Sequence, residues 1–190
     1  VQIPVPEPEP DELLVRVKAV GICGSDVHGY DGSTGRRIPP VIMGHEASGI
    51  VEAVGEECRS FSIGDRVTFD STIYCGVCAY CKRGEINFCE NRRVLGVSCD
   101  EYRRDGAFGE YVTVPERVSY RLPEAVSFHH AAMIEPMAIA LHALEISPYS
   151  IGKTGVVVGA GVIGLLLIQM LRTAGLGTII AVDIAEERLD

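Results

Sequence analysis

Four cysteines lie close together in the stretch YCGVCAYCKRGEINFCE, residues 74–90. Their spacing, Cys75-x2-Cys78-x2-Cys81-x7-Cys89, raises four alternatives: a disulfide knot, an iron–sulfur cluster, a thiol redox pair or a metal site. The fourth cysteine comes too late for the bacterial ferredoxin pattern, and a redox pair needs no further thiols beside it. Four thiolates in one loop suit tetrahedral zinc with every position filled, which favours a structural zinc site.

The composition bears on the same alternatives and on the class of protein. Seven cysteines in 190 residues are too few for a disulfide-dense miniprotein, and an odd number fits a reduced compartment better than secretion. The start of the chain shows no secretory signal, and we expect a cytoplasmic protein. A net charge of −9 argues against nucleic acid. The most apolar run, residues 155–171, is too short and too rich in glycine for a membrane span.

A second candidate site is the glycine motif GAGVIG, with Gly159, Gly161 and Gly164. The motif alone is a weak signal, but here it follows an apolar strand directly and opens a helix, which is the context of dinucleotide binding. Gly159 would permit the tight turn, Gly161 would let the backbone approach the pyrophosphate, and Gly164 would let helix and strand pack closely. The helix N-terminus would supply unpaired N–H groups to the phosphates.

An acid, Asp183, ends the next predicted strand about 20 residues beyond the motif, where an acid contacts the adenosine ribose. Its charge would repel a 2′-phosphate and no arginine follows it directly, so we predict NAD rather than NADP. We also place Ile163, inside the motif, and Arg188, shortly after Asp183, in the predicted cofactor site. A nucleotide-free unit of the same fold is the alternative.

The elements that position these residues change character along the chain. Strands are predicted in the first two-thirds from period-two patterns, at 13–20, 47–55, 65–70 and 109–115. From residue 127 the apolar spacing becomes helical, and Pro136 fits the first turn of a new helix. The segment 155–183 then predicts strand, helix and strand, the first unit of a parallel sheet. We place the domain boundary in the helical stretch, with domains at 1–137 and 138–190.

Two further stretches, GICGSDVHGYDG (21–32) and GHEASGIVEAVG (44–55), complete a pattern. Together with the cysteine loop and the glycine motif, in this order, they make the chain resemble the zinc-dependent medium-chain dehydrogenases. The resemblance implies an α/β plus β protein: a GroES-like catalytic domain with a structural zinc lobe, followed by the first part of a Rossmann domain. It also implies a homo-oligomer, a dimer or tetramer, acting on a small-molecule alcohol without nucleic-acid or membrane partners.

The same resemblance implies a second, catalytic zinc, held by Cys23, His45 and a carboxylate. The alcohol dehydrogenase branch uses a later cysteine as third ligand, and this chain has none there. The segment MIEPMAIALHAL instead resembles the polyol (sorbitol) dehydrogenase branch. In that branch the acid beside the histidine, here Glu46, is a ligand, and the acid of the IEP segment, here Glu135, binds the metal, its water or the substrate. Two zinc ions per subunit are therefore expected.

The implied reaction is hydride transfer between a polyol or secondary alcohol and NAD. Ser25 and His28 occupy the proton-relay position of the family, and Asp26 would orient the His45 ring. One departure concerns the residue after the relay histidine, where polyol dehydrogenases often carry a substrate tyrosine but this chain has Gly29.

The alternatives are a threonine-type amino-alcohol dehydrogenase and a non-catalytic zinc-binding module of the same fold. Because the sequence stops one strand–helix–strand unit into the Rossmann domain, we expect a piece of a longer enzyme that is inactive alone.

Overall fold

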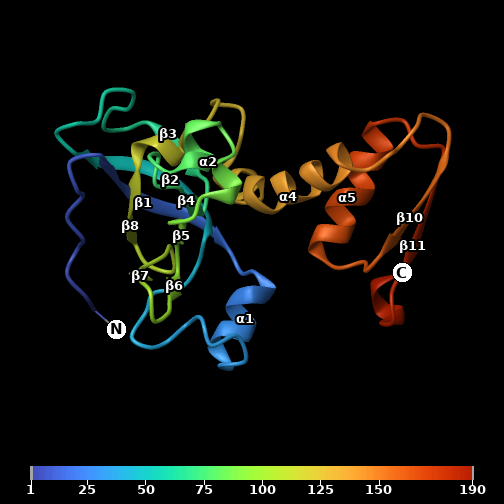
Figure 1. Ribbon diagram of the computed structural model, residues 1–190, viewed down its shortest axis with the longest axis horizontal. Coiled ribbons are helices and arrows are strands. Elements are labelled where there is room, and N and C mark those ends of the chain that lie inside the picture. The colour runs from blue at the N-terminus through green and yellow to red at the C-terminus, as the bar shows by residue number, and fades with distance from the viewer. Residues whose placement is uncertain (1, 190) are drawn as a thin grey trace. The chain divides into compact units, whose positions relative to one another are not determined.

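A computed structural model describes residues 2–189 of the chain (Figure 1). The chain divides into two compact units, residues 1–133 and 134–190. The sequence placed the boundary between 137 and 138, inside helix α4 (Ile134–Glu145). The structure instead divides the chain just before this helix, at Met133, where the helical run is interrupted, and α4 packs against α5 (Val162–Thr173) of the second unit.

A five-stranded antiparallel sheet forms the centre of the first unit, in the strand order β8-β1-β2-β3-β9. Its members are β1 (Glu12–Gly21), β2 (Glu46–Val54), β3 (Arg66–Phe69), β8 (Tyr111–Pro115) and β9 (Ser119–Arg121). Four of them coincide with the predicted strands. The pattern analysis missed β9, because three residues are too few to show a period of two.

The core of this unit consists of β-branched and leucine side chains from the sheet. Leu13, Val15, Val51, Val67 and Val114 are fully shielded from solvent. Such side chains pack well on a pleated surface, and each contributes about 1.5–3 kcal/mol when buried. Leu14 is also buried, at 7% exposure, so β1 begins buried on both faces rather than alternating as a half-buried strand.

The pairing of β1 with β2 contains two register shifts. The first lies between Leu14 and Val15 and the second between Val17 and Ala19. Beyond them the strands end with Gly21 opposite Glu46. The shifts therefore set which residues face each other at the end of the sheet that leads into the candidate site.

Smaller elements surround the sheet. They are the helices α1 (Gly24–Tyr30), α2 (Ala79–Lys82) and α3 (Phe128–Ala132), the 3-10 turns η1 (Ile86–Phe88) and η2 (Glu116–Val118), and the short strands β4 (Thr72–Ile73), β5 (Arg93–Val94), β6 (Val97–Ser98) and β7 (Arg103–Arg104). Helix α1 directly follows β1 by way of Cys23, so the sheet fixes where this helix begins.

The second unit contains β10 (Thr154–Val158), α5, β11 (Thr178–Val182), the 3-10 turn η3 (Glu186–Arg188) and α4. Strands β10 and β11 pair in parallel, as predicted from the sequence. Helix α5 ends at Thr173, and Gly175 follows with a φ of +89°, a left-handed conformation that favours glycine. Among the described residues, no helix is both long and apolar enough to cross a membrane.

Candidate metal and nucleotide sites

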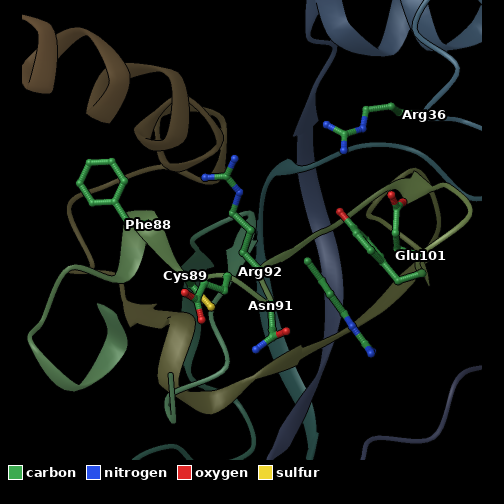
Figure 2. Close-up of a pocket in the computed structure, with 9 residues that line it drawn as sticks. Arg36, Phe88, Cys89, Asn91, Arg92 and Glu101 are labelled. Atoms are coloured by element: carbon green, nitrogen blue, oxygen red, sulfur yellow. The ribbon is translucent and has the colours of Figure 1, made fainter. Parts of the chain in front are cut away.

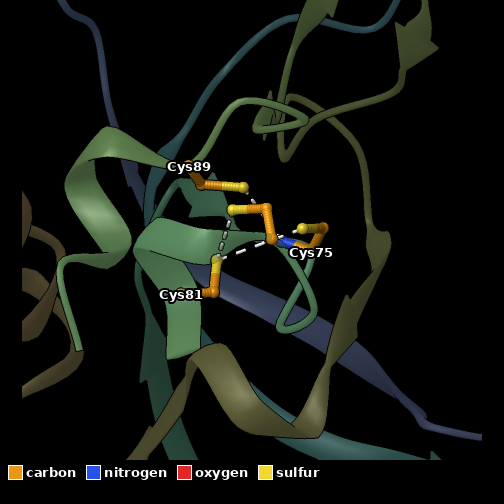
Figure 3. Close-up of side chains that lie close together, drawn as sticks. Cys75, Cys81 and Cys89 are labelled. Atoms are coloured by element: carbon orange, nitrogen blue, oxygen red, sulfur yellow. Dashed lines mark hydrogen bonds between the residues drawn. The ribbon is translucent and has the colours of Figure 1, made fainter. Parts of the chain in front are cut away.

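The four cysteines of the loop come together in the structure. One ligand atom from each of Cys75, Cys78, Cys81 and Cys89 lies within 4.8 Å of all the others. The Cys78 and Cys81 sulfurs are 3.5 Å apart and those of Cys75 and Cys81 are 4.0 Å apart (Figure 3). Zinc–sulfur bonds of about 2.3 Å in a tetrahedron place the sulfurs about 3.8 Å apart. The donor set and spacing therefore fit a structural zinc.

Short elements hold these sulfurs in place. Cys78 precedes α2 and Cys81 lies within it, while Cys89 follows η1. The backbone N–H of Cys75 donates to the Cys89 sulfur over 3.2 Å. Backbone N–H groups of Val77 and Cys78 lower the pKa of Cys75 to about 6, whereas loss of solvation and the Cys78 thiol raise that of Cys81 to about 12. Thiolates this close repel one another, and a divalent cation would offset the repulsion.

A second cluster unites residues from separate parts of the first unit. Ligand atoms of Cys23, His45 and Glu46 lie within 4.8 Å of one another. His45 and Glu46 are buried, and Cys23 is partly exposed. A thiolate, an imidazole and a carboxylate fill three positions of a four-coordinate zinc and leave one open, which is the arrangement of catalytic zinc. The cluster therefore fits the predicted catalytic metal.

Asp26 connects the two segments that carry these ligands. Its Oδ2 accepts the N–H of Cys23 at 3.1 Å, and its Oδ1 accepts the N–H of Gly44 at 3.4 Å. The same Oδ1 is 3.4 Å from His45 Nδ1, although this pair lacks the geometry of a hydrogen bond. Because Nδ1 faces the carboxylate, we assign Nε2 of His45 to the metal, as in other carboxylate–histidine–zinc arrangements.

The electrostatics of this pair follow from burial and proximity. Burial favours the neutral His45 ring and lowers its pKa. The Asp26 carboxylate and, to a smaller extent, Cys23 outweigh this effect and raise the pKa of His45 to about 9. Burial would also raise the pKa of Asp26, yet His45 and the backbone N–H groups of Cys23 and Gly44 lower it. A metal must displace the imidazole proton, because only the neutral ring binds.

Two glycines that the sequence analysis did not single out make room for the cluster. A Cβ on Gly21 would lie 2.4 Å from Glu46 Oε2, so the carboxylate rests on the bare backbone of the facing strand. Gly44, directly before His45, has a φ of +89°, and a Cβ there would meet the Phe108 ring at 2.6 Å. Both positions therefore require glycine for steric reasons. At Gly21 the requirement becomes visible only when β1 is paired with β2, which places Glu46 opposite.

The remaining predicted catalytic residues occupy defined places. Ser25 and His28 both lie on α1 and are exposed. The Nδ1 of His28 is 3.7 Å from Asp31 Oδ2. Glu135 lies in the first turn of α4, within the second unit, and its place at the metal remains a prediction.

The glycine motif has the backbone that its predicted roles require. Gly159 has a φ of +100°, and its N–H donates to Val182 O at the end of β11. A Cβ on Gly164 would lie 1.8 Å from Gly159 O, so α5 packs directly on the turn. A Cβ on Gly161, the N-cap of α5, would meet nothing within 4 Å. The open space at Gly161 is where a pyrophosphate would approach the helix N-terminus.

Asp183 lies against this turn. Its Oδ2 accepts the N–H of Ala160 at 2.7 Å, and its Oδ1 accepts the N–H of Ala185 at 2.9 Å. These bonds lower its pKa, so the side chain is a carboxylate near neutral pH. Arg188 Nη1 lies 3.6 Å from Oδ2, and Ile163 is part of the first turn of α5. The acid is thus bound to the glycine turn itself, a link that the sequence did not predict.

A pocket of about 610 Å³ lies beside the cysteine loop (Figure 2). Its lining consists of Arg36, Phe88, Cys89, Glu90, Asn91, Arg92, Arg93, Glu101 and Tyr102. Apart from Cys89, none of the residues predicted to act in chemistry contributes to this lining. The pocket is therefore separate from the Cys23–His45–Glu46 cluster.

Comparison with known proteins places the chain in a family. The model for the alcohol dehydrogenase GroES-like domain matches residues 9–124. The chain belongs to this family. The resemblance to zinc-dependent medium-chain dehydrogenases, with its GroES-like fold, is thereby confirmed, and a relative named sorbitol dehydrogenase supports the polyol branch.

Three of the similar proteins illustrate the range of this alcohol dehydrogenase family. Sorbitol dehydrogenase of Bacillus subtilis is 37% identical over 99% of the chain and 53% of its own length. Alcohol dehydrogenase TADH of Thermus sp. ATN1 matches with a TM-score of 0.92 and 34% identity, over 100% of this chain and 56% of its own. A zinc-binding dehydrogenase of Sinorhizobium meliloti 1021, solved with NADP, matches with a TM-score of 0.89 and 41% identity, over 98% of this chain and 53% of its own. The chain thus spans about half the length of these relatives.

Proposed function

We propose that the chain is the N-terminal part of an NAD-linked, zinc-dependent dehydrogenase of polyols or secondary alcohols. The observation that carries the proposal is the cluster of Cys23, His45 and Glu46 ligand atoms within 4.8 Å of one another. Its composition leaves a coordination position for substrate, in contrast to the closed set of four cysteines. A zinc-binding module without catalysis would not need this second, open cluster.

Each residue has a defined task in the proposed reaction. Cys23, His45 and Glu46 would hold the metal, and Asp26, 3.4 Å from Nδ1 of His45, would orient its ring. Bound zinc would supply a Lewis acid that lowers the pKa of a substrate hydroxyl, and bound NAD would accept hydride. Ser25 and His28 move the hydroxyl proton toward solvent, since both lie exposed on α1, next to Cys23 in the sequence.

The glycine turn and Asp183 would bind the cofactor. Gly161 and the N-terminus of α5 would hold the pyrophosphate, with Ile163 in the same turn, and Asp183 would accept hydrogen bonds from the ribose. The carboxylate charge favours NAD over NADP. A relative with 41% identity was solved with NADP, and Arg188, a cation, lies 3.6 Å from Asp183. The preference is therefore tested by comparing NAD with NADP, which differ only in the 2′-phosphate.

Glu135 distinguishes the proposed substrate class. If it binds the metal or its water, or anchors a second hydroxyl of a polyol, the change Glu135→Gln keeps the shape but removes the charge. Turnover with a polyol in the full-length enzyme should then fall by about 10²-fold, the scale of acid–base groups. The alternative is that Glu135 only stabilises the first turn of α4, at about 0.3–1 kcal/mol, with turnover unchanged.

The test of the whole proposal is an assay of the full-length protein, purified without chelators. Two zinc ions per subunit and NAD-dependent oxidation of polyols or secondary alcohols are expected. Oxidation of threonine in preference to polyols would support the amino-alcohol alternative, and one zinc without any turnover would support the non-catalytic module. The homo-oligomeric state and cytoplasmic location are part of the same proposal, to be checked by light scattering and cell fractionation.

A further inference from the structure

Two neighbouring arginines, Arg36 and Arg37, differ sharply in environment. Arg36 is exposed and lines the pocket of Figure 2, whereas the side chain of Arg37 is only 8% exposed. Taking a guanidinium out of water is costly unless an opposite charge or hydrogen bonds compensate it. The burial of Arg37 therefore requires a counter-charge.

Asp26 supplies that charge. Arg37 Nη2 lies 4.0 Å from Asp26 Oδ1, and the Asp26 side chain is only 2% exposed. The same oxygen lies 3.4 Å from His45 Nδ1. Arg37 Nη1 donates to Arg36 O at 3.1 Å, and its buried Nε has no hydrogen-bond partner among the residues described. One oxygen of this buried carboxylate thus lies near both a permanent cation and the histidine of the metal cluster.

The surroundings hold the Arg37 side chain in this position. A Cβ on Gly29 would lie 2.3 Å from Arg37 Cγ, so the stem of the arginine occupies the space that a side chain at 29 would need. The backbone is held as well, since Ile38 N–H donates to Ser98 O at 3.0 Å and Ser98 N–H donates to Arg36 O at 3.2 Å. Gly29, the position that departs from the tyrosine of polyol dehydrogenases, therefore has a structural partner in Arg37.

We infer that Arg37 is a positioning residue of the catalytic metal site, which holds the Asp26 carboxylate against His45 and thereby fixes the ring that binds zinc. When His45 binds a metal its ring is neutral, so Arg37 remains as a fixed positive charge beside the buried carboxylate. Loss of an outer partner of this kind typically lowers metal affinity about 10- to 100-fold. The inference rests on the proposed function, because it requires a metal at this cluster.

The test uses the full-length protein and compares Arg37→Gln with Arg36→Gln, its exposed neighbour. Zinc per subunit is measured after dialysis against graded chelator, with Cys23→Ser marking the level of the structural zinc alone. We expect Arg37→Gln to release the second zinc at about 10-fold lower chelator concentration and Arg36→Gln to match wild type. Gly29→Ala, which displaces the arginine stem, should resemble Arg37→Gln, and Arg37→Lys should be intermediate because it keeps the charge.

A spectroscopic readout separates positioning from general stability. In cobalt-substituted protein, Arg37→Gln should alter the visible absorption of the catalytic metal even at full occupancy, and Arg36→Gln should not. Wild-type zinc retention and cobalt spectrum in Arg37→Gln would overturn the inference, even if its melting temperature falls. One zinc in the wild type would overturn the proposed function as well, whereas two zincs and an unaffected Arg37→Gln overturn the role of Arg37 alone. If Arg37→Gln does not fold, Gly29→Ala and Arg37→Lys decide by the same criteria.

Discussion

The two candidate metal sites of the first unit are assembled in opposite ways. The loop of Cys75, Cys78, Cys81 and Cys89 takes all its ligands from one short segment with its own small helices. The cluster of Cys23, His45 and Glu46 takes its ligands from two segments, which the pairing of β1 with β2 and the carboxylate of Asp26 bring together. In the loop, metal binding would fold the segment, whereas in the cluster the folded sheet places the ligands before a metal binds.

This difference follows from the entropy of closing loops. Ligands close in sequence are brought together at little entropic cost, so a metal can fold such a loop and contribute its binding energy directly to stability. Ligands on a sheet are held in place by the packing of its hydrophobic core, which does not depend on the metal. Substitutions in the loop should therefore affect stability first, and substitutions in the cluster should affect turnover first.

The largest effect is expected from Cys89→Ser in the loop. Cys89 is 4% exposed and its sulfur accepts the N–H of Cys75, so its loss removes a ligand and a buried contact. The free energy of unfolding should fall by about 4 kcal/mol or more, the range of lost metal sites. Urea denaturation measures this, with Cys99→Ser, outside both clusters, as control. A loss below about 1 kcal/mol would mean that the loop needs no metal.

The next largest effect is expected from Cys23→Ser in the cluster, which should lower turnover rather than stability. Serine is a weak zinc ligand, so one of the two zincs should be lost and turnover should fall by more than about 10²-fold. The sheet does not depend on this thiol, and stability should change little. Metal analysis and denaturation of the same sample measure both. A loss of stability as large as that of Cys89→Ser would contradict the contrast between the sites.

A smaller effect is expected from Gly21→Ala, which changes no ligand. The added methyl group would lie 2.4 Å from Glu46 Oε2 and must push the carboxylate aside. Turnover and zinc retention should fall together by about 10-fold, since ligand orientation is disturbed but not lost. Gly24→Ala is the matched control, because a Cβ there meets nothing within 4 Å. Equal behaviour of the two variants would show that Glu46 is not needed in its present position.

The last effect, which changes cofactor preference rather than turnover, concerns the glycine turn of the second unit. Asp183→Asn keeps the shape and one acceptor oxygen but removes the charge. The ratio of kcat/KM for NAD to that for NADP should fall by about 10-fold, equivalent to about 1.4 kcal/mol. Steady-state kinetics of the full-length enzyme measure the ratio, with Glu187→Gln as a neighbouring charge control. An unchanged ratio would remove Asp183 from the ribose site.

The sequence predicted those parts of the fold that carry a periodic signal. The strands at Val15, Val51 and Val67 and the parallel pair around the glycine motif agree with the structure because apolar spacing reflects burial. The short strand β9 and the burial of Leu14 on the second face of β1 were not predicted. The strand β9 is too short to show a period of two, and the burial of Leu14 depends on neighbours distant in sequence, which a local pattern does not contain.

The candidate sites divide in the same way. The cysteine loop followed from spacing alone, because its ligands are local. His45 and Cys23 came only from a resemblance, since a single histidine or cysteine carries no such signal. Gly21 and Arg37 were missed altogether. The need for glycine at 21 arises from Glu46 on the facing strand, and the burial of Arg37 arises from Gly29 and Asp26.

The two register shifts between β1 and β2 have a consequence for how the sequence can vary. One shift places an extra residue in β2, at Glu52, and the other places one in β1, at Lys18, so they compensate before the strands reach Gly21 and Glu46. Deleting Lys18, which has no partner in β2, would place Ala19 directly after Val17 and keep Gly21 opposite Glu46, whereas inserting one residue between Ala19 and Gly21 would move Gly21 past Glu46 and turn it to the opposite face. The core around Leu13 lies before the shift and would persist. We therefore expect a one-residue deletion at Lys18 to be tolerated, and a one-residue insertion between Ala19 and Gly21 to give a folded protein that has lost its metal site.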